Sequence, residues 1–288
     1  MPRIHMTDYL ELTKPRVTLM VMITTLVGFY LGAPGKPDWL LLLHTLLGTA
    51  LVAGGTSALN QYLERDIDVK MSRTRSRPLP SGRLTPAQAL AFAVAIAVIG
   101  LVYLATAVNL LTATLAATTL LVYAFVYTPL KQKTPLSTLV GAIPGALPPM
   151  GGWTAARNEL SIEAWVLFGI LFLWQLPHVL AISWLYSEDY RRGGFPLLPV
   201  LDPQGQSTGR QIISNCLALL PVSLLPSLIG LAGELYFVGA LLLGLSFLAM
   251  GVLVAVERSN LSARRLLFAS LLYLPALLGL LSLDKTSL

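Results

Sequence analysis

Apolar runs of about 20 residues alternate with short polar segments along the whole chain. A helix of that length crosses the ~30 Å hydrocarbon core of a bilayer, and the two-residue alternation typical of β-strands is absent from the sequence. The pattern therefore predicts an all-α transmembrane helical bundle of about nine spans. The predicted spans are residues 17–34, 39–59, 87–107, 110–127, 136–153, 164–186, 211–231, 235–256 and 266–283.

Composition excludes an ordinary soluble globule. Of the 288 residues, 55% are hydrophobic and 12% are charged, against about 25% charged residues in a typical soluble domain. The connections are mostly too short to form a separate soluble domain, so a single transmembrane domain over residues 1–288 is expected. Cys216 is the one cysteine in the sequence, which excludes an intrachain disulfide.

The basic residues predict the orientation of the bundle. With these spans, 17 of the 20 Lys and Arg residues fall on the side of the N-terminus, while Lys36, Arg157 and Lys285 fall on the other side. Because positively charged loops face the cytoplasm, the N-terminus is expected there and the C-terminus across the membrane. The same bias accounts for the net charge of +6, so no nucleic-acid partner is expected.

Two connections on the N-terminal side are long, residues 60–86 and residues 187–210. They are four spans apart, and each runs from a tyrosine and nearby acids to a Pro-Leu segment. This parallel suggests a weak internal repeat of four-helix units.

The first long connection opens with Asn60, Glu64 and Asp68, which are spaced by four residues. On a helix these side chains share one stripe, while Asp66 points elsewhere. Carboxylate and amide oxygens suit Mg²⁺, which commonly binds through one or two carboxylates together with the phosphates of a substrate. Since ionisable groups at the membrane boundary are costly, the stripe favours a Mg²⁺ and diphosphate site over a solvated helix end.

A dense run of cations follows the acidic stripe. Guanidinium groups bind phosphoryl oxygens in pairs, although any one arginine is equally well explained as an ordinary positive charge of a cytoplasmic loop. The run consists of Lys70, Arg73, Arg75, Arg77 and Arg83.

The sixth span contains an intramembrane histidine. His178 and Asp189 are eleven residues apart, so on an unbroken helix they lie about 20° from each other. Pro177 removes an amide hydrogen and is expected to free a carbonyl one turn earlier. The alternative for His178 is a packed, hydrogen-bonded side chain, which is the interpretation adopted for His44.

Five segments in order carry a resemblance to a known family. They are Leu12 to Val17, Asn60 to Gly82, Tyr127 to Lys131, Gly145 to Trp153, and Pro177 to Pro199. Together they resemble the UbiA superfamily of intramembrane prenyltransferases, and within it the members that farnesylate protoheme. The last three spans add little to this resemblance.

The resemblance implies an activity. A farnesyl group would pass from farnesyl diphosphate to a vinyl group of protoheme IX, with water added, to give heme O and diphosphate with Mg²⁺ as cofactor. It also implies a bacterial cytoplasmic membrane, an active site toward the cytoplasm, and heme-handling membrane enzymes as partners.

The resemblance also implies roles for individual residues. Asn60, Glu64 and Asp68 would be the first metal and diphosphate motif, and Asp189 would be part of the second. The residues that would contact the diphosphate are Arg73, Arg75, Arg77 and Lys131. Glu64 stands where many relatives have aspartate, and the second region lacks regularly spaced aspartates, which leaves the number of metal ions open.

The heme side of the site has fewer candidates. His178 would ligate the heme iron, orient a propionate or help to deprotonate the added water. Trp153, Trp174 and Trp184 would either stack on the porphyrin or pack within the protein.

Three alternatives remain from the sequence. The nearest is the same chemistry on a quinone-ring precursor, because the diphosphate apparatus would be shared. A membrane transporter would use the four-span repeat for alternating access, and a non-catalytic scaffold would need no oxygen stripe beside a run of cations.

Overall fold

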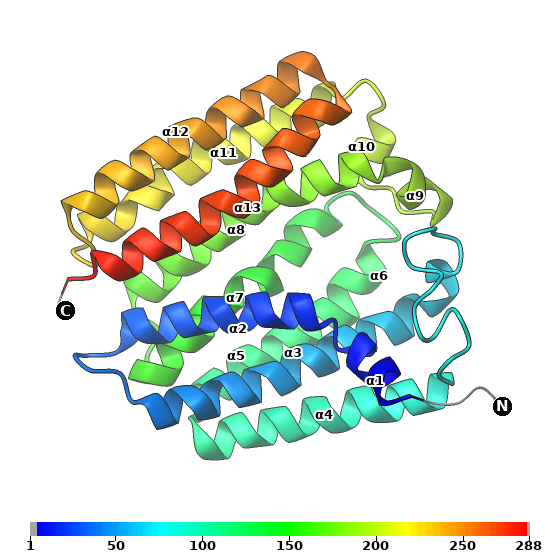
Figure 1. Cartoon of the computed structure of the whole chain (residues 1–288), viewed down its shortest axis with the longest axis horizontal. Helices are drawn as coiled ribbons and strands as arrows, with labels where there is room; N and C mark the ends of the chain where they lie inside the picture. Colours follow the sequence, from blue (N-terminus) through cyan, green and yellow to red (C-terminus); the bar gives the residue numbers. More distant parts are fainter. Residues whose placement is uncertain (1–4, 287–288) are drawn as a thin grey trace.

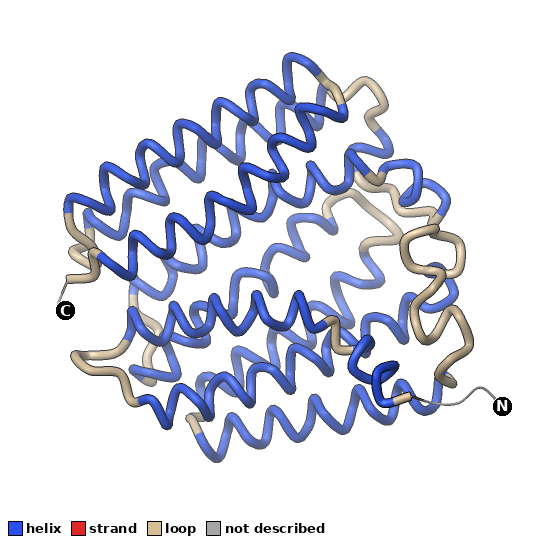
Figure 2. Tube along the Cα trace, viewed as in Figure 1, coloured by secondary structure: helices blue, strands red, loops and turns tan. Residues whose placement is uncertain are grey.

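The computed structural model of the protein describes residues 5–286. Within this range the helices are joined by loops and there is no β-strand (Figures 1 and 2). The helices are α1 (Met6–Leu12), α2 (Pro15–Gly32), α3 (Trp39–Asp68), α4 (Pro86–Ala107), α5 (Leu110–Leu121), the π-helical η1 (Val122–Tyr127), α6 (Thr128–Leu130), α7 (Ser137–Arg157), α8 (Ile162–Leu185), α9 (Ser187–Arg192), α10 (Leu198–Leu201), α11 (Gln206–Leu228), α12 (Glu234–Glu257) and α13 (Asn260–Leu283).

Each of the predicted spans is helical in the structure. Within the described range, eight helical stretches are long and apolar enough to cross a membrane: α2, α3, α4, the continuous stretch Leu110–Leu130, α8, α11, α12 and α13. The remaining predicted span is α7, a 21-residue helix that contains three prolines. The predicted fold class is thereby confirmed, and the chain is a multi-pass membrane protein.

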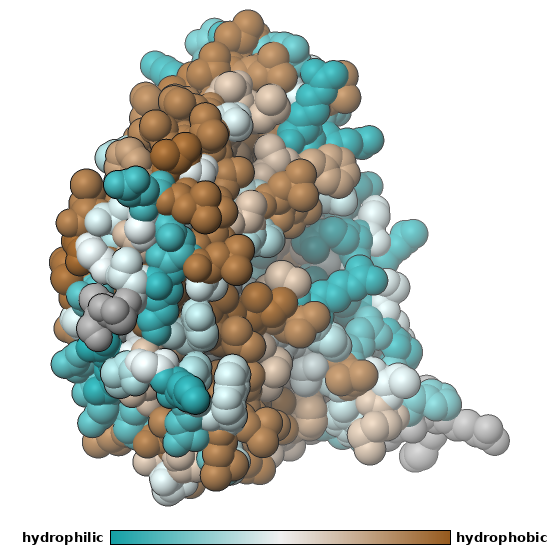
Figure 3. Space-filling model, turned by 60° about the vertical axis from the view of Figure 1, so that its left-hand side comes forward, coloured by the Kyte–Doolittle hydropathy of each residue, from teal (hydrophilic) through white to brown (hydrophobic). Residues whose placement is uncertain are grey.

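Large hydrophobic side chains cover much of the outer surface. Leu110, Val256 and Leu272, for example, are each more than 70% exposed, and Figure 3 shows extended hydrophobic areas on the face that it presents. Contiguous apolar surface on this scale is a liability in water. It is the surface expected of helices whose outer faces contact lipid.

Helices α2 and α7 cross at very short range through glycines. A Cβ added to Gly152 of α7 would lie 1.9 Å from the carbonyl oxygen of Thr25, and one added to Gly28 of α2 would lie 1.9 Å from that of Pro149. Small residues allow backbones to approach closely in membranes, where hydrophobic burial does not drive helix association. This crossing fixes α2 against α7, and both helices line the cavity described below.

The two termini lie at opposite ends of the bundle (Figure 1). One end carries α1, the 69–85 connection and α9. At the other end, the Lys285 ammonium donates to the carbonyl oxygens of Tyr30 and Ala33 at 2.7 and 2.8 Å, which ties the chain after α13 to the end of α2. The four-helix repeat stays a prediction.

Candidate active site

Helix α3 presents the predicted oxygen stripe to the protein interior. Its 30 residues span about 45 Å at 1.5 Å per residue, so its last turns extend beyond a hydrocarbon core of ~30 Å. Asn60, Glu64 and Asp68 are 2%, 3% and 0% exposed, whereas the Asp66 side chain is 83% exposed. The spacing argument for one shared face is confirmed.

Each residue of the stripe contacts a cation from another segment. The Lys14 ammonium donates to Asn60 Oδ1 at 2.7 Å, and the Lys131 ammonium donates to Glu64 Oε1 at 3.1 Å. Arg77 donates to Asp68 Oδ2 at 2.7 Å. The two buried carboxylates need such partners, because an unpaired buried charge is costly. The three contacts therefore hold three other segments against one face of α3: the α1–α2 turn, the α6–α7 connection and the 69–85 connection.

Lys14 has an unusual backbone. It precedes Pro15 at the start of α2 and adopts the left-handed conformation, with φ of +48°. Such a conformation is costly for a residue with a Cβ and is concentrated at functional sites. Burial, reinforced by the Arg77 guanidinium, lowers the pKa of Lys14 to about 7.

Lys131 differs from Lys14 in its electrostatic setting. Burial acts to lower the pKa of Lys131, but the Glu64 carboxylate raises it above its ordinary value. Its ammonium also lies 4.4 Å from the centre of the Phe195 ring and 5.8 Å from that of Tyr190. Lys131 is therefore a fixed cation, held between the stripe on α3 and the segment that follows α8.

Asp189 lies at the same end of the bundle but is bound by different groups. It accepts hydrogen bonds from the backbone amides of Ser72 and Arg73, at 2.9 and 3.2 Å, and from the Arg192 guanidinium at 2.8 Å. Burial acts to raise the pKa of Asp189, but these donors hold it below its ordinary value. The contacts join the two long connections, which are distant in the sequence.

The alignment of His178 with Asp189 on an unbroken helix is wrong. Helix α8 ends at Leu185, and Tyr186 interrupts it before α9 begins at Ser187. His178 Nδ1 instead lies 2.7 Å from the Ser270 hydroxyl on α13. The interruption turns Asp189 toward the 69–85 connection, whereas His178 faces α13.

The three tryptophans pack within the protein. Trp153 is completely buried, and the Trp174 ring stacks on His178 with centroids 5.0 Å apart. The indole nitrogen of Trp184 donates to Asn260 Oδ1 at 3.1 Å.

The stripe has the donor chemistry that Mg²⁺ requires. Asp68 Oδ1 is buried and has no hydrogen-bond partner among the described residues, so an oxygen ligand is available on the face that carries Glu64. Across the described part of the chain, however, no three His, Cys, Asp or Glu side chains gather into a ready-made metal cluster. The stripe thus fits an ion shared with a phosphate group better than an all-protein site. Asp189 as a further ligand stays a prediction.

The predicted diphosphate contacts fall into two groups. Lys131 and Arg77 contact the stripe directly, while Arg73 and Arg75 are exposed on the 69–85 connection. The Arg73 guanidinium lies 5.8 Å from the centre of the Tyr190 ring, on which Lys131 also packs.

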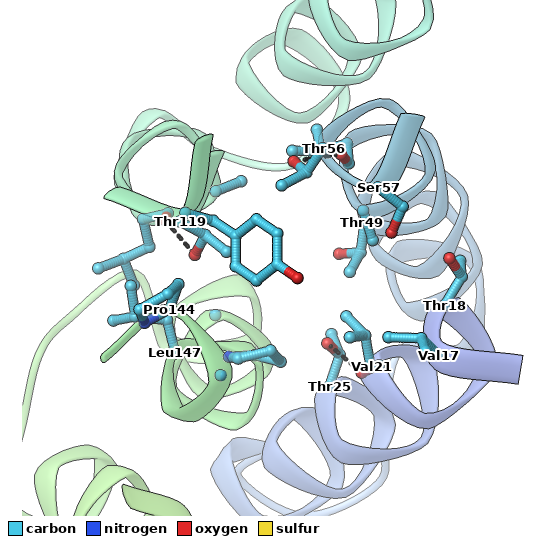
Figure 4. Close-up of a pocket in the computed structure, with 18 of the residues that line it drawn as sticks. Val17, Thr18, Val21, Thr25, Thr49, Thr56, Ser57, Thr119, Pro144 and Leu147 are labelled. Atoms are coloured by element: carbon cyan, nitrogen blue, oxygen red, sulfur yellow. Dashed lines mark hydrogen bonds between the residues drawn. The ribbon is translucent and has the colours of Figure 1, made fainter. Parts of the chain in front are cut away.

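An apolar cavity of about 200 Å³ adjoins Lys14 (Figure 4). Residues of α2, α3, α5 and α7 line it, and Tyr123 of η1 contributes as well. Three of its threonines donate to carbonyls of their own helices: Thr25 to Val21, Thr56 to Val52 and Thr119 to Leu115. These three hydroxyls are therefore satisfied, and the lining is mostly apolar beside a buried cation.

Sequence reasoning assigned no site role to Lys14, Thr128 or Tyr190. Thr128 accepts a hydrogen bond from Asn60 Nδ2 at 3.1 Å, and the centre of the Tyr190 ring lies 5.8 Å from both the Arg73 guanidinium and the Lys131 ammonium. All three residues lie within segments that carry the family resemblance, and this was the signal available for them. No spacing or charge pattern singles them out within those segments.

Buried acids, matching cations and an adjoining apolar cavity inside a multi-pass bundle fit an intramembrane enzyme that acts on a substrate with an anionic head and an apolar tail. Residues 21–272 match the model of the UbiA prenyltransferase family. The chain belongs to that family.

Curated relatives match nearly the whole chain. One is the protoheme IX farnesyltransferase of Solibacter usitatus, 53% identical over 292 residues, with 98% of this chain and 100% of the relative covered. Another is the protoheme IX farnesyltransferase of Salinibacter ruber, 47% identical over 277 residues, with 96% and 98% covered.

Solved structures share the fold. A structure of digeranylgeranylglyceryl phosphate synthase superposes with a TM-score of 0.80 at 18% identity, covering 96% of this chain and 97% of that one. A UbiA homologue from Archaeoglobus fulgidus bound to DMAPP and Mg²⁺ gives a TM-score of 0.69 at 16% identity, with 96% and 99% covered. At such identities the similarity establishes the helical architecture alone.

Proposed function

We propose that the protein transfers a farnesyl group from farnesyl diphosphate to a vinyl group of protoheme IX, with addition of water, to give heme O and diphosphate. Full-length similarity to relatives named for this reaction supports the proposal. The structural observation that carries it is the buried stripe on α3, which faces Lys14, Lys131 and Arg77 beside the apolar cavity.

The chemical difficulty is heterolysis of the allylic C–O bond. It leaves negative charge on the diphosphate and positive charge on the prenyl carbon. Asn60, Glu64 and Asp68 would hold Mg²⁺, which would supply electrostatic stabilisation of the leaving group. Lys131 and Arg77 already point at this stripe, so their positive charge acts on the departing diphosphate without reorganisation.

The cavity holds the isoprenoid and limits water. Its hydrocarbon walls bury the apolar chain, and Lys14, which lines it, contacts Asn60 of the stripe. The electron-rich vinyl group attacks the allylic carbon as the C–O bond breaks. Water then adds to the porphyrin-side carbon and loses a proton, so it has to enter after the new C–C bond forms.

The direct test is to incubate the purified protein with protoheme, farnesyl diphosphate and Mg²⁺ and to analyse the porphyrin by mass spectrometry. We expect a mass gain of one farnesyl group plus one hydroxyl group. If diphosphate is released only when an aromatic quinone precursor replaces protoheme, the acceptor assignment is wrong. If substrates are bound or moved but diphosphate is never released, the transporter is favoured.

Filling the cavity should change chain-length preference. Ala53 lines the cavity on α3, and Ala53→Phe removes part of its volume. We expect kcat/KM for farnesyl diphosphate to fall roughly tenfold relative to geranyl diphosphate, because a few buried methylene groups are worth about 1.4 kcal/mol. Competition between the two diphosphates in one reaction measures this ratio. An unchanged ratio would place the isoprenoid elsewhere.

His178 is expected to contact the porphyrin through Nε2, since its contact with Ser270 uses Nδ1. His178→Ala should then alter the absorption spectrum of bound protoheme and lower turnover. Ser270→Ala, which removes the packing contact but leaves the imidazole, serves as the comparison. If His178→Ala lowers only the melting temperature, as Ser270→Ala does, the histidine packs α8 against α13 and has no substrate role.

The proposal places the protein in a bacterial cytoplasmic membrane with the α3 stripe toward the cytoplasm. The strong bias of basic residues to that end of the bundle supports this orientation. The farnesyl tail makes the product more lipophilic than protoheme. Heme-handling membrane enzymes are therefore the expected partners for its delivery and removal.

A further inference from the structure

A second cavity of about 180 Å³ has no part in the proposed reaction. It lies among α7, α8, α10 and α11 and shares no lining residue with the cavity of Figure 4. Five of its nine lining residues are leucines, from α8, α10, α7 and the residue just before α7, and α11 contributes Gln211 and Asn215.

Asn215 is a buried polar residue whose side-chain amide lacks a hydrogen-bond acceptor within the described chain. It is 7% exposed, and its Nδ2 has no hydrogen-bond partner among the described residues. Burying an amide donor without an acceptor costs on the order of 1–3 kcal/mol. Within a membrane span, such a residue indicates a bound group that supplies the acceptor.

The cavity borders the surrounding lipid. Leu136 and Leu139, which line it, are 61% and 39% exposed on the outer surface. Arg210 is exposed on the polar first turns of α11, and Asn215 lies about 7.5 Å deeper at 1.5 Å per residue. This places the amide where the headgroup region meets the hydrocarbon.

We propose that this cavity binds one acyl chain of a membrane glycerolipid, with the Asn215 amide rotated by 180° so that Nδ2 faces the cavity and donates a hydrogen bond to the acyl-ester carbonyl. The carbonyl supplies the acceptor that the protein does not provide, and the leucine walls bury the first methylene groups of the chain. Gln211, exposed one helical turn closer to the interface, faces the glycerol side. The bilayer is the source of the ligand because it is the solvent around Leu136 and Leu139.

The test compares two lipids that differ only at the ester. Full-length protein, delipidated in detergent, is melted with dioleoylphosphatidylcholine or with its dialkyl ether analogue, which lacks the carbonyl. We expect the ester lipid to raise Tm by roughly 2–4 °C more than the ether lipid. Asn215→Leu should abolish this difference, while Ser214→Ala, the exposed neighbouring residue on the same helix, should keep it.

Asn215→Ala provides a second variant in case leucine does not fit. Equal stabilisation of the wild type by both lipids would overturn the proposal, as would an ester-specific shift that survives in both Asn215 variants. A further melting experiment replaces the lipid with protoheme. A protoheme-specific shift that is lost in Asn215→Leu, without an ester-specific one, would assign the cavity to the porphyrin and refute lipid binding. None of these melting experiments depends on prenyl transfer.

Discussion

Asp68→Asn is expected to lower kcat/KM for farnesyl diphosphate by about 10³-fold or more while the protein remains folded in the membrane. The substitution keeps the shape of the side chain but removes a charge that is fully buried and paired with Arg77. Loss of this charge weakens Mg²⁺ binding and releases Arg77 from its position, and each effect reduces stabilisation of the departing diphosphate. Release of inorganic diphosphate by the purified variant measures the loss.

The matched control for this prediction is Asp66→Asn. Asp66 lies on the same helix, but its side chain is 83% exposed and contacts only Arg65 among the ion pairs of the described chain. We expect its activity to stay within about twofold of the wild type, since exposed ion pairs contribute little. Wild-type turnover in Asp68→Asn would remove Asp68 from the metal and diphosphate site.

Gly152→Ala is expected to lower the melting temperature by roughly 5–10 °C in detergent. The new Cβ would lie 1.9 Å from the carbonyl oxygen of Thr25 and 2.7 Å from the backbone nitrogen of Phe29. Since backbone atoms cannot rotate away, α2 and α7 must move apart, and overpacking of this kind costs about 1–3 kcal/mol. The shift also deforms the cavity between these helices, so a lower affinity for farnesyl diphosphate should accompany it.

The control is the neighbouring glycine. A Cβ added to Gly151 meets no atom within 4 Å, so Gly151→Ala should leave the melting temperature unchanged or raise it slightly, because alanine favours the helix. Equal melting temperatures for the two variants would mean that the close crossing of α2 and α7 does not limit stability.

The local sequence was sufficient to predict the helices and the shared face of Asn60, Glu64 and Asp68. A membrane-spanning segment satisfies its own backbone hydrogen bonds, so hydropathy and length predicted the eight apolar spans of the described chain without knowledge of their neighbours. Asn60, Glu64 and Asp68 share a face because helical geometry fixes their angular spacing, and the structure confirms that this face is buried. Even α7, which is rich in proline and glycine, was recovered as a helix.

The sequence was least informative where the chain leaves its helices. Helix α8 ends at Leu185, and beyond the break Asp189 accepts hydrogen bonds from the backbone amides of Ser72 and Arg73, more than 110 residues away. These contacts accompany the break at Tyr186, which separates Asp189 from the face of His178. Angular positions calculated for an unbroken helix take no account of such long-range contacts.

By itself, the sequence determined that this is an all-helical membrane protein, with a row of oxygen ligands at one helix end and a run of cations after it. Tertiary structure alone decided which cation meets which oxygen group of the stripe: Lys14 meets the Asn60 amide, Lys131 the Glu64 carboxylate and Arg77 the Asp68 carboxylate. Helical periodicity acts over a few residues, so it orders groups along one element. Pairing across elements follows from long-range packing and from the cost of leaving a buried charge without a partner.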